Sequence, residues 1–129
     1  MKKCISLMSF FLVFSQLLRG STSEEVEKAI QTGDATAICK HFVDNVDLQI
    51  LDKEDVYSKS QAELILKDFF AKHPVKSFKI MHKSVSKGDN QYSIGLLETY
   101  NGKFRIYFLM KNNLFKLLVS QFRIETENE

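Results

Sequence analysis

The sequence predicts an α+β domain, in which helices near the N-terminus pack on an antiparallel sheet built mainly from the second half of the chain. Before Pro74, the only proline, apolar residues recur three times at the spacing of an amphipathic helix. After Pro74, four runs alternate apolar and polar residues between turn-forming residues, as strands with one buried face do. A shorter run with the same alternation lies between the second and third helical segments.

The first 23 residues have the three-part layout of a secretory signal peptide. Residues 1–3 carry two lysines, residues 4–18 are largely apolar, and residues 19–23 are an arginine followed by small residues. The apolar part is shorter than the roughly 20 residues that cross a bilayer. We therefore expect residues 1–23 to be a signal peptide and residues 24–129 to form one exported domain without a membrane span, either periplasmic or secreted.

Without its signal peptide, the domain is nearly neutral. The whole chain has 18 basic and 16 acidic residues, and Lys2, Lys3 and Arg19 lie in the predicted signal. A nucleic-acid-binding protein normally carries a concentrated basic surplus, so the composition argues against that partner. Cys39 is the only cysteine of residues 24–129, so the domain cannot form an internal disulfide and must be stabilised by packing.

Two short helices are expected at the start of the domain. The first spans residues 22–30, because Thr22 and Glu25 have the spacing of a capping box. Gly33 can end this helix, and Asp34 can cap the second one. The apolar stripe of the second helix comprises Ala35, Ile38, Cys39, Phe42 and Val43.

The third helix has the strongest helical signals in the chain. It begins at two overlapping capping boxes, which pair Ser58 with Gln61 and Ser60 with Glu63. Pro74 ends it, because a proline disfavours helical geometry at the residue before it. The apolar stripe of this helix comprises Ala62, Ile65, Leu66, Phe69 and Phe70.

Strands are predicted wherever apolar residues alternate with polar ones. Asn101-Gly102 is the sharpest turn signal, because both positions tolerate the positive φ of a two-residue hairpin turn. Further turns are expected at residues 87–90 and at Asn112-Asn113. Val46, Leu48 and Ile50 form a half-buried strand, and Tyr92, Ile94 and Leu96 begin a later one. The residues expected on the helix-covered face of the sheet are Phe78, Ile80 and His82, and Phe104, Ile106, Phe108 and Met110.

The opposite sheet face is less polar than a solvated face should be. Tyr107 and Leu109 alternate with the Phe104 series, so they point away from the helices. An exposed apolar patch of this kind more often contacts a partner subunit than water. We therefore predict a homodimer interface formed by Arg105, Tyr107, Leu109, Leu117, Val119 and Arg123. The two arginines can form cross-strand salt bridges with Glu98 or Glu125.

Three stretches of the chain carry a resemblance to a known family. They read YSKSQAELILKDFFAKHPVKSFKIMHKS, YSIGLLETYNGKFRIYFLMK and QFRIE, and they follow a GD pair and the segment FVDNVDLQI. The chain resembles the domain-of-unknown-function 4783 family of small exported bacterial proteins. The resemblance implies a nuclear-transport-factor-2-like fold, a cone with three N-terminal helices packed on a curved antiparallel sheet. This fold serves enzymes as well as binding and dimerisation modules, so it does not choose a function.

No catalytic, nucleotide-binding or metal-binding motif is present, and we predict no cofactor and no metal. His41 and His73 fit the polar side of a helix and a helix end, respectively. His82 follows Phe78 and Ile80 on the expected helix-covered face, so it is the best candidate for a general base. The residues expected around a cone pocket are His82, Tyr57, Tyr92, Asp44 and Asp47.

These observations favour a non-catalytic exported module over an enzyme. Such a module would dimerise through the outer sheet face and hold a small apolar ligand in the cone, or bind an envelope protein. The alternative is an isomerase- or hydrolase-like enzyme that uses His82 with a nearby tyrosine or aspartate. An enzyme would need an open, polar-lined cavity that reaches His82, whereas an assembly module can fill that space with Phe69, Phe78 and Phe104.

Overall fold

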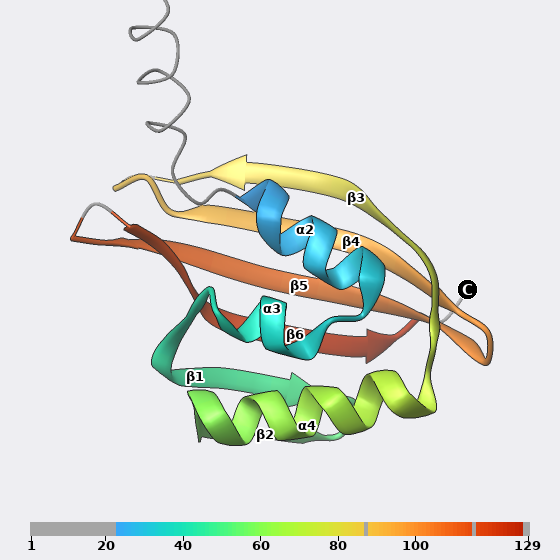
Figure 1. Ribbon diagram of the computed structural model, residues 1–129. Coiled ribbons are helices and arrows are strands. Elements are labelled where there is room, and N and C mark those ends of the chain that lie inside the picture. Colours follow the sequence, from blue (N-terminus) through green and yellow to red (C-terminus); the bar gives the residue numbers. More distant parts are fainter. Residues whose placement is uncertain (1–22, 87, 115, 128–129) are drawn as a thin grey trace, which may run out of the picture.

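A computed structural model describes residues 23–86, 88–114 and 116–127, and it has the predicted α+β class. Within these ranges, helices precede and interrupt a six-stranded sheet (Figure 1). The helices are α2 (Ser23–Thr32), α3 (Ala35–Cys39) and α4 (Lys59–Lys72). The strands are β1 (Phe42–Ile50), β2 (Lys53–Ser58), β3 (Val75–Val85), β4 (Gln91–Thr99), β5 (Gly102–Asn113) and β6 (Lys116–Thr126).

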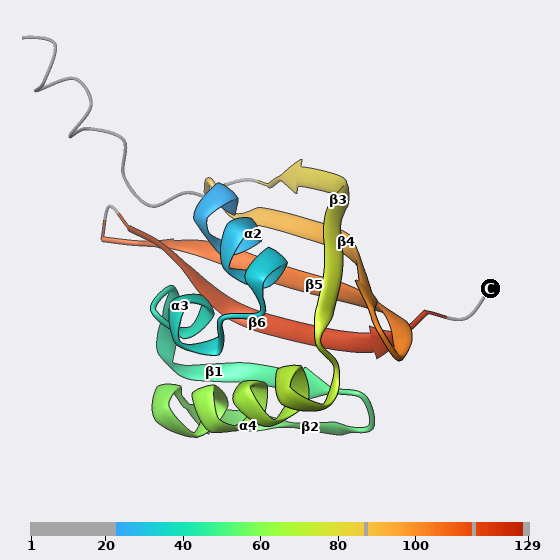
Figure 2. The ribbon, with the colours of Figure 1, turned by 45° about the vertical axis from the view of Figure 1, so that its right-hand side comes forward.

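The strands lie in the order β2-β1-β6-β5-β4-β3. All neighbours are antiparallel except β1 and β6, which run parallel. The predicted wholly antiparallel sheet is therefore wrong at one pair, because the first strand lies beside the last one. The strand predicted between the second and third helices is β1, and β2 follows it before α4. Figures 1 and 2 show α2, α3 and α4 together on one face, with α4 over β1 and β2 and α2 beside β3.

The boundary between α3 and β1 differs from the sequence prediction. Asp34 caps α3 as expected, because its Oδ1 accepts a hydrogen bond from the backbone N–H of Ala37 at 3.1 Å. The helix ends at Cys39, however, and Phe42 already belongs to β1, where it pairs with Val119 of β6. The predicted helix through Val43 is wrong because pairing with a distant strand overrides the local helical spacing. Thr22, the expected cap of the first helix, lies outside the described residues.

Helix α4 begins and ends as predicted. Ser58 is its N-cap and forms a reciprocal capping box with Gln61, so the first of the two overlapping boxes is the one used. His73 is the C-cap, directly before Pro74. Strand β2 immediately before α4 was not predicted, because most of its residues are exposed and show no apolar alternation.

Of the three turns predicted in the second half, the one at residues 87–90 lies between β3 and β4 as expected, and the other two are displaced. Thr99 pairs with Gly102, so Tyr100 and Asn101 form the β4–β5 turn, one residue earlier than expected. Thr99 fixes this turn, because its Oγ1 donates to the Gly102 carbonyl at 2.7 Å. Strand β5 runs through Asn113, so the expected Asn112-Asn113 turn is wrong, and the chain bends at Leu114 with a positive φ of 48°.

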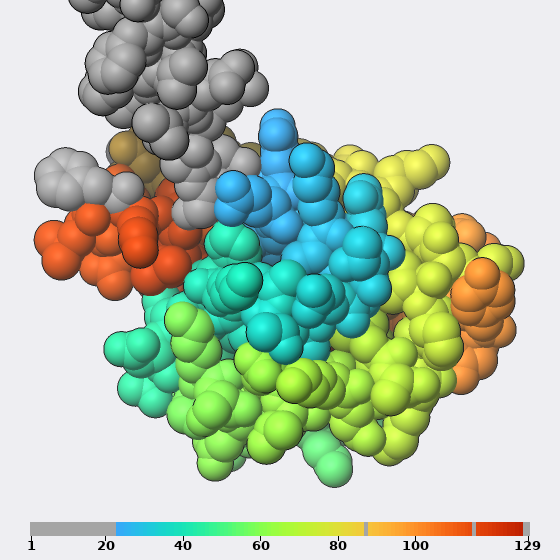
Figure 3. All heavy atoms as spheres, viewed as in Figure 1, coloured from blue at the N-terminus to red at the C-terminus, as the bar shows by residue number. Residues whose placement is uncertain are grey.

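The core lies between the helices and the sheet and is rich in phenylalanine. The ring of Phe122 lies 5.5 Å from that of Phe42 and 6.4 Å from that of Phe108, measured between centroids. Figure 3 shows this side of the molecule closed by α2, α3 and α4. The fully buried large side chains are Phe42, Phe108, Phe122, Ile30, Ile38, Leu48, Leu66, Leu97, Ile106, Met110, Ile124 and Val26.

One glycine is required by this packing. A Cβ atom on Gly95 of β4 would lie only 2.4 Å from the ring of Phe78 in β3. Phe78 itself is buried, so its ring covers the backbone of the neighbouring strand where a side chain would otherwise stand. Gly95 thus permits a close approach that any other residue would prevent.

Candidate functional site

The five residues predicted to surround a cone pocket do not meet in the structure. His82 was expected beneath the helices, and this placement is wrong. A β-bulge between Ile80 and His82 puts His82 opposite Ile94, on the uncovered side of the sheet, where it is exposed. An extra residue reverses the alternation of a strand, so the pattern that placed Phe78 and Ile80 inside does not continue to His82.

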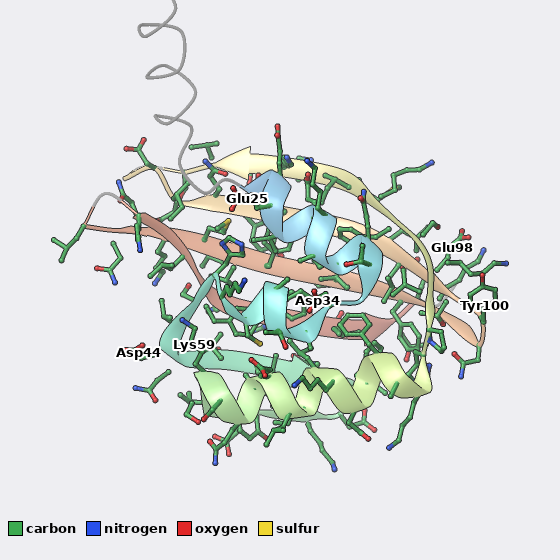
Figure 4. All side chains as sticks on the ribbon, in the orientation of Figure 1. Glu25, Asp34, Asp44, Lys59, Glu98 and Tyr100 are labelled. Atoms are coloured by element: carbon green, nitrogen blue, oxygen red, sulfur yellow. The ribbon has the colours of Figure 1, made fainter. Side chains whose placement is uncertain are left out.

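The two aspartates lie at different places. Asp44 is exposed beside the N-terminal end of α4, where it shares a shallow depression with Lys59. Figure 4 shows these two residues at the opposite end of the molecule from Tyr100 in the β4–β5 turn. Asp47 lies between the buried Val46 and Leu48, so its side chain points away from the helices.

The two tyrosines are also separated. Tyr57 lies near the end of β2 and lines a groove beside α4. Tyr92 lies on the uncovered sheet face, where its ring centroid is 6.3 Å from that of Tyr107. Burial and the neighbouring Tyr107 raise the pKa of Tyr92. The residues of the predicted pocket are therefore divided among three surfaces: the depression beside Asp44, the groove beside Tyr57 and the uncovered sheet face. The groove and the uncovered face, which hold the two tyrosines, are the two candidates for a functional site.

The first surface is a groove between α4 and the turn that joins β1 to β2, which we call the hairpin groove. Its volume is about 580 Å³, within the usual range of sites for small molecules. Its lining residues are Ile50, Leu51, Asp52, Lys53, Tyr57, Leu64, Ile65, Asp68, Phe69, Lys72 and His73.

The walls of the hairpin groove are mainly apolar. Leu64 of α4 is 66% exposed although it is a large hydrophobic residue, and Ile65 and Phe69 line the groove further along the same helix. Leu51 has a positive φ of 57°, which is rare for a leucine and is held by a 2.8 Å hydrogen bond from its N–H to the carbonyl of Ile124. Strained backbone of this kind is often found at binding sites.

His73 lies at one end of α4, where it lines the groove and is held by the β4–β5 turn. The Nδ2 of Asn101 donates to the carbonyl of Lys72 at 2.7 Å, and its Oδ1 lies 3.0 Å from Nδ1 of His73. The His73 ring also packs against Phe69 and Phe104, with centroid distances of 4.6 and 4.8 Å. A turn that is 28 residues away in sequence thus fixes the end of α4.

The second surface is the sheet face that the helices leave uncovered, which we call the outer face. Its central residues are Tyr92, Ile94, Leu96, Tyr107, Leu109, Gln121 and Arg123. All of them are half-buried although no described element covers them. A depression of about 330 Å³ lies between the two tyrosines and the side chains of Gln121, Arg123 and Glu125.

Four of the six predicted dimer residues lie on this outer face, and two do not. Arg105, Tyr107, Leu109 and Arg123 point away from the helices as expected. Val119 is fully buried and Leu117 packs against the core, so their predicted placement is wrong. The cause is a bulge at Ser120, because Leu109 pairs with Gln121 while the next residue, Met110, pairs with Val119.

The arginines of the outer face have partners other than those predicted. Arg105 forms an ion pair with Glu127 at 2.8 Å, and Arg123 lies 3.5 Å from Glu54 of β2. Hydrogen bonds from Arg105 to Tyr107 and Glu127 raise the pKa of its guanidinium. The outer face therefore carries both charge signs around an apolar centre.

Other chemistry is limited in the part of the chain that the structure describes. No group of three or more histidine, cysteine or acidic side chains in residues 23–86, 88–114 and 116–127 is arranged to hold a metal ion. Among the same residues, no helix is both long and apolar enough to cross a membrane. Burial raises the pKa of the Cys39 thiol to about 12, so the unreactive protonated form prevails.

The fold and its two surfaces define a class of protein. The α+β fold of this chain, with helices and a six-stranded sheet, is similar to the folds of nuclear-transport-factor-2-like and cystatin-like proteins. The chain belongs to the family described as domain of unknown function DUF4783, whose sequence profile matches residues 23–125. The family resemblance predicted from the sequence is confirmed.

Crystal structures of two relatives support this assignment. A DUF4783 family protein from Bacteroides uniformis ATCC 8492 is 31% identical, with a TM-score of 0.79 over 84% of this chain and 100% of that chain. One from Bacteroides ovatus ATCC 8483 is 28% identical, with a TM-score of 0.77 over 81% and 94%, respectively. A ketosteroid isomerase-like protein from Erwinia carotovora atroseptica SCRI1043 shares the fold alone, at 11% identity and a TM-score of 0.66 over 83% and 92%. No curated protein matches the chain.

Leu64 and His73 are two of the groove residues that the sequence prediction did not assign to a pocket. Leu64 lies outside the apolar stripe of α4. A leucine on the polar side of a helix is the signal that could have indicated a binding surface there. His73 was explained by its place at a helix end. Its contact with Asn101 depends on how the β4–β5 turn folds back onto α4, and no local pattern carries that information.

Proposed function

We propose that this protein is a non-catalytic binding module that holds a small, largely apolar ligand in the hairpin groove. The observation that carries the proposal is the groove itself, which has about 580 Å³ of volume and walls formed by Leu64, Ile65 and Phe69. Sites for small molecules are typically concave, mainly apolar and supplied with a few polar groups. Tyr57 and His73 are such groups here.

A non-catalytic role is favoured over an isomerase- or hydrolase-like enzyme. General acid-base catalysis needs titratable groups that converge on one reacting centre. His82, Asp44, Asp47, Tyr57 and Tyr92 are divided among separate surfaces instead. Replacement of His82 by alanine is expected to leave ligand binding unchanged, and a loss of turnover in this variant would instead support the enzyme.

The ligand proposal is tested by native mass spectrometry of the protein purified from its own host. The wild-type protein is expected to carry an additional small mass. Leu64→Arg should lose that mass, because it places a charge in the apolar wall at a position that is exposed enough to tolerate it. Leu114→Arg is the matched control, since Leu114 is 87% exposed and lies outside the groove. Wild-type protein without any added mass would contradict retention of a ligand.

We also propose that two copies associate through the outer face. Its half-buried tyrosines and aliphatic residues, with Arg105 and Arg123 at the sides, have the composition of an interface, because arginine and tyrosine are enriched there. Both charge signs on one patch suit a two-fold interface, in which a patch meets its own copy. Wild-type protein is expected to have the mass of a dimer in solution. A monomer would direct the search to an envelope protein as the partner.

Export is the remaining part of the proposal. The predicted signal peptide, residues 1–23, precedes the domain, and Ser23 is the first residue of α2. Ser23 is buried, and its hydroxyl lies 3.3 Å from Nζ of Lys83 in β3. Cleavage of the predicted signal peptide is expected to give protein from its own host an intact mass that lacks residues 1–23. A mass that includes them would contradict cleavage.

A further inference from the structure

We infer that the hairpin groove selects an uncharged, largely apolar molecule that carries a hydrogen-bond donor such as a hydroxyl group, and that Nε2 of His73 accepts this hydrogen bond. This ligand class rests on the groove being the binding site proposed above. It follows from the hydrogen bonds that hold the His73 side chain at the end of α4.

The amide of Asn101 can have only one orientation. One of its polar atoms lies 2.7 Å from the backbone carbonyl oxygen of Lys72, and a carbonyl oxygen can only accept a hydrogen bond. The atom that faces Lys72 must therefore be the NH₂ group. Consequently, Oδ1 of Asn101 is the atom that faces His73, at 3.0 Å from Nδ1.

This orientation determines which nitrogen of His73 carries the proton. Because Oδ1 of Asn101 can only accept, Nδ1 of His73 must donate, and the neutral imidazole then has an unprotonated Nε2. Nε2 has no hydrogen-bond partner within the described ranges, and the ring to which it belongs lines the groove. His73 therefore offers an acceptor to a bound molecule.

The acceptor is held in place before a ligand arrives. The His73 ring packs against Phe69 of α4 and Phe104 of β5, with centroid distances of 4.6 and 4.8 Å. Side chains whose rotamers are fixed by packing and by a second hydrogen bond give a site its selectivity. Asn101 acts here as a positioning residue, since it touches His73 and the α4 terminus and does not line the groove.

The electrostatics of this end of the groove also favour a donor. His73 follows the last turn of α4, and the C-terminal end of a helix carries partial negative charge. Nζ of Lys72 forms an ion pair with Oδ2 of Asp68 at 3.0 Å, so the positive charge of Lys72 already has a counter-ion. A ligand with a hydroxyl group suits this end better than one with a carboxylate.

The test uses three naphthalene probes of similar size, titrated into the full folded protein at pH 7.5 by calorimetry. Expected affinity is about 5- to 10-fold higher for 1-naphthol, which has a donor, than for 1-methoxynaphthalene, which has none. His73→Phe keeps an aromatic ring against Phe69 and should reduce this ratio to about one by weakening 1-naphthol binding alone. Asn101→Leu should also lower the ratio of the two affinities, because His73 loses the partner that fixes its tautomer. If Asn101 only stabilised the end of α4, its replacement would weaken the binding of both probes equally.

A failure of the inferred ligand class and a failure of the proposed groove would give different results. Equal binding of 1-naphthol and 1-methoxynaphthalene to wild-type protein would overturn the inference while leaving the groove as a binding site. Tighter binding of 1-naphthoate than of 1-naphthol would overturn it too, because it would make a cation the recognition group. If neither neutral probe binds, or if Leu64→Arg does not weaken both, the groove itself is not the site.

Discussion

The two faces of the sheet are built from alternate residues of the same strands, yet they hold their side chains differently. On the helix-covered face, Phe122 is fully buried against Phe42 and Phe108. On the outer face, the side chain of Tyr107 is similar in size to that of Phe122, but it is only half-buried. Leu109, on the same face of β5, is also only half-buried. The covered face is therefore closely packed, whereas the outer face keeps partly exposed apolar side chains.

The bulges show how a residue is assigned to one face or the other. Alternation along β6 places Val119 with Gln121 and Arg123, but the bulge at Ser120 reverses the faces and buries Val119. The same happens in β3, where a bulge after Ile80 moves His82 to the outer face. One inserted residue thus exchanges a core position for a surface position. Four experiments test this division.

The largest effect is expected for Val119→Arg. Val119 is fully buried, so the substitution would place an unpaired charge in the core at a cost of about 4 kcal/mol or more. This loss is comparable with the total stability of an ordinary domain, so little folded protein should remain. Circular dichroism and urea unfolding measure it. Folded Val119→Arg with normal stability would mean that Val119 lies on the outer face after all.

Truncation of an aromatic ring should separate the two faces next. Phe122→Ala is expected to lower the free energy of unfolding by about 3–5 kcal/mol, because it leaves a cavity beside Phe42 and Phe108. Tyr107→Ala on the outer face is the matched control and should cost about 1 kcal/mol. Urea unfolding of both variants gives the comparison, and similar losses would contradict the difference in packing.

Gly95→Ala tests the closest contact on the covered face. Its new methyl group would lie 2.4 Å from the ring of Phe78, and such overpacking is expected to cost about 1–3 kcal/mol. Phe78→Leu removes the ring, so Gly95→Ala should cost clearly less in that background. A double-mutant cycle from thermal or urea unfolding measures the coupling. Additive effects would show that the ring does not cause the loss.

The smallest change in stability is expected for Leu109→Arg. Leu109 lies on the outer face, so the free energy of unfolding of the monomer should change by only about 0.5 kcal/mol. The substitution should nevertheless convert the proposed dimer into a monomer. Light scattering measures the molar mass of Leu109→Arg and of the control Leu114→Arg, and only the first is expected to be a monomer. Urea unfolding measures the change in stability. A dimer that survives the substitution would place the interface elsewhere.

Local signals predicted much of this fold. The caps at Asp34 and Ser58 and the stop at Pro74 depend on residues within one helical turn, and all three were located correctly. Strand β2 was missed, because an exposed edge strand needs no apolar alternation. The start of β1 was misplaced because Phe42 fits a helical stripe as well as it fits a strand.

The candidate sites were less predictable, since they depend on contacts between distant segments. The faces of His82 and Val119 were wrong because a bulge leaves no clear mark in the apolar pattern. The hairpin groove brings the β1–β2 turn against α4, and His73 at its end is fixed by Asn101. Of the five residues predicted for a pocket, Tyr57 is the one that lines this groove.

The parallel pairing of β1 with β6 also has a consequence for the order in which the protein folds. In the sheet, β1 and β2 reach the other strands only through β6, which is Lys116–Thr126. A nascent chain that ends at Leu114 contains β1 to β5 but has no strand to join its two halves. Pairing between segments so far apart in sequence makes folding slow. The six-stranded sheet therefore cannot be completed until β6 has been synthesised, so the two halves of the sheet join late.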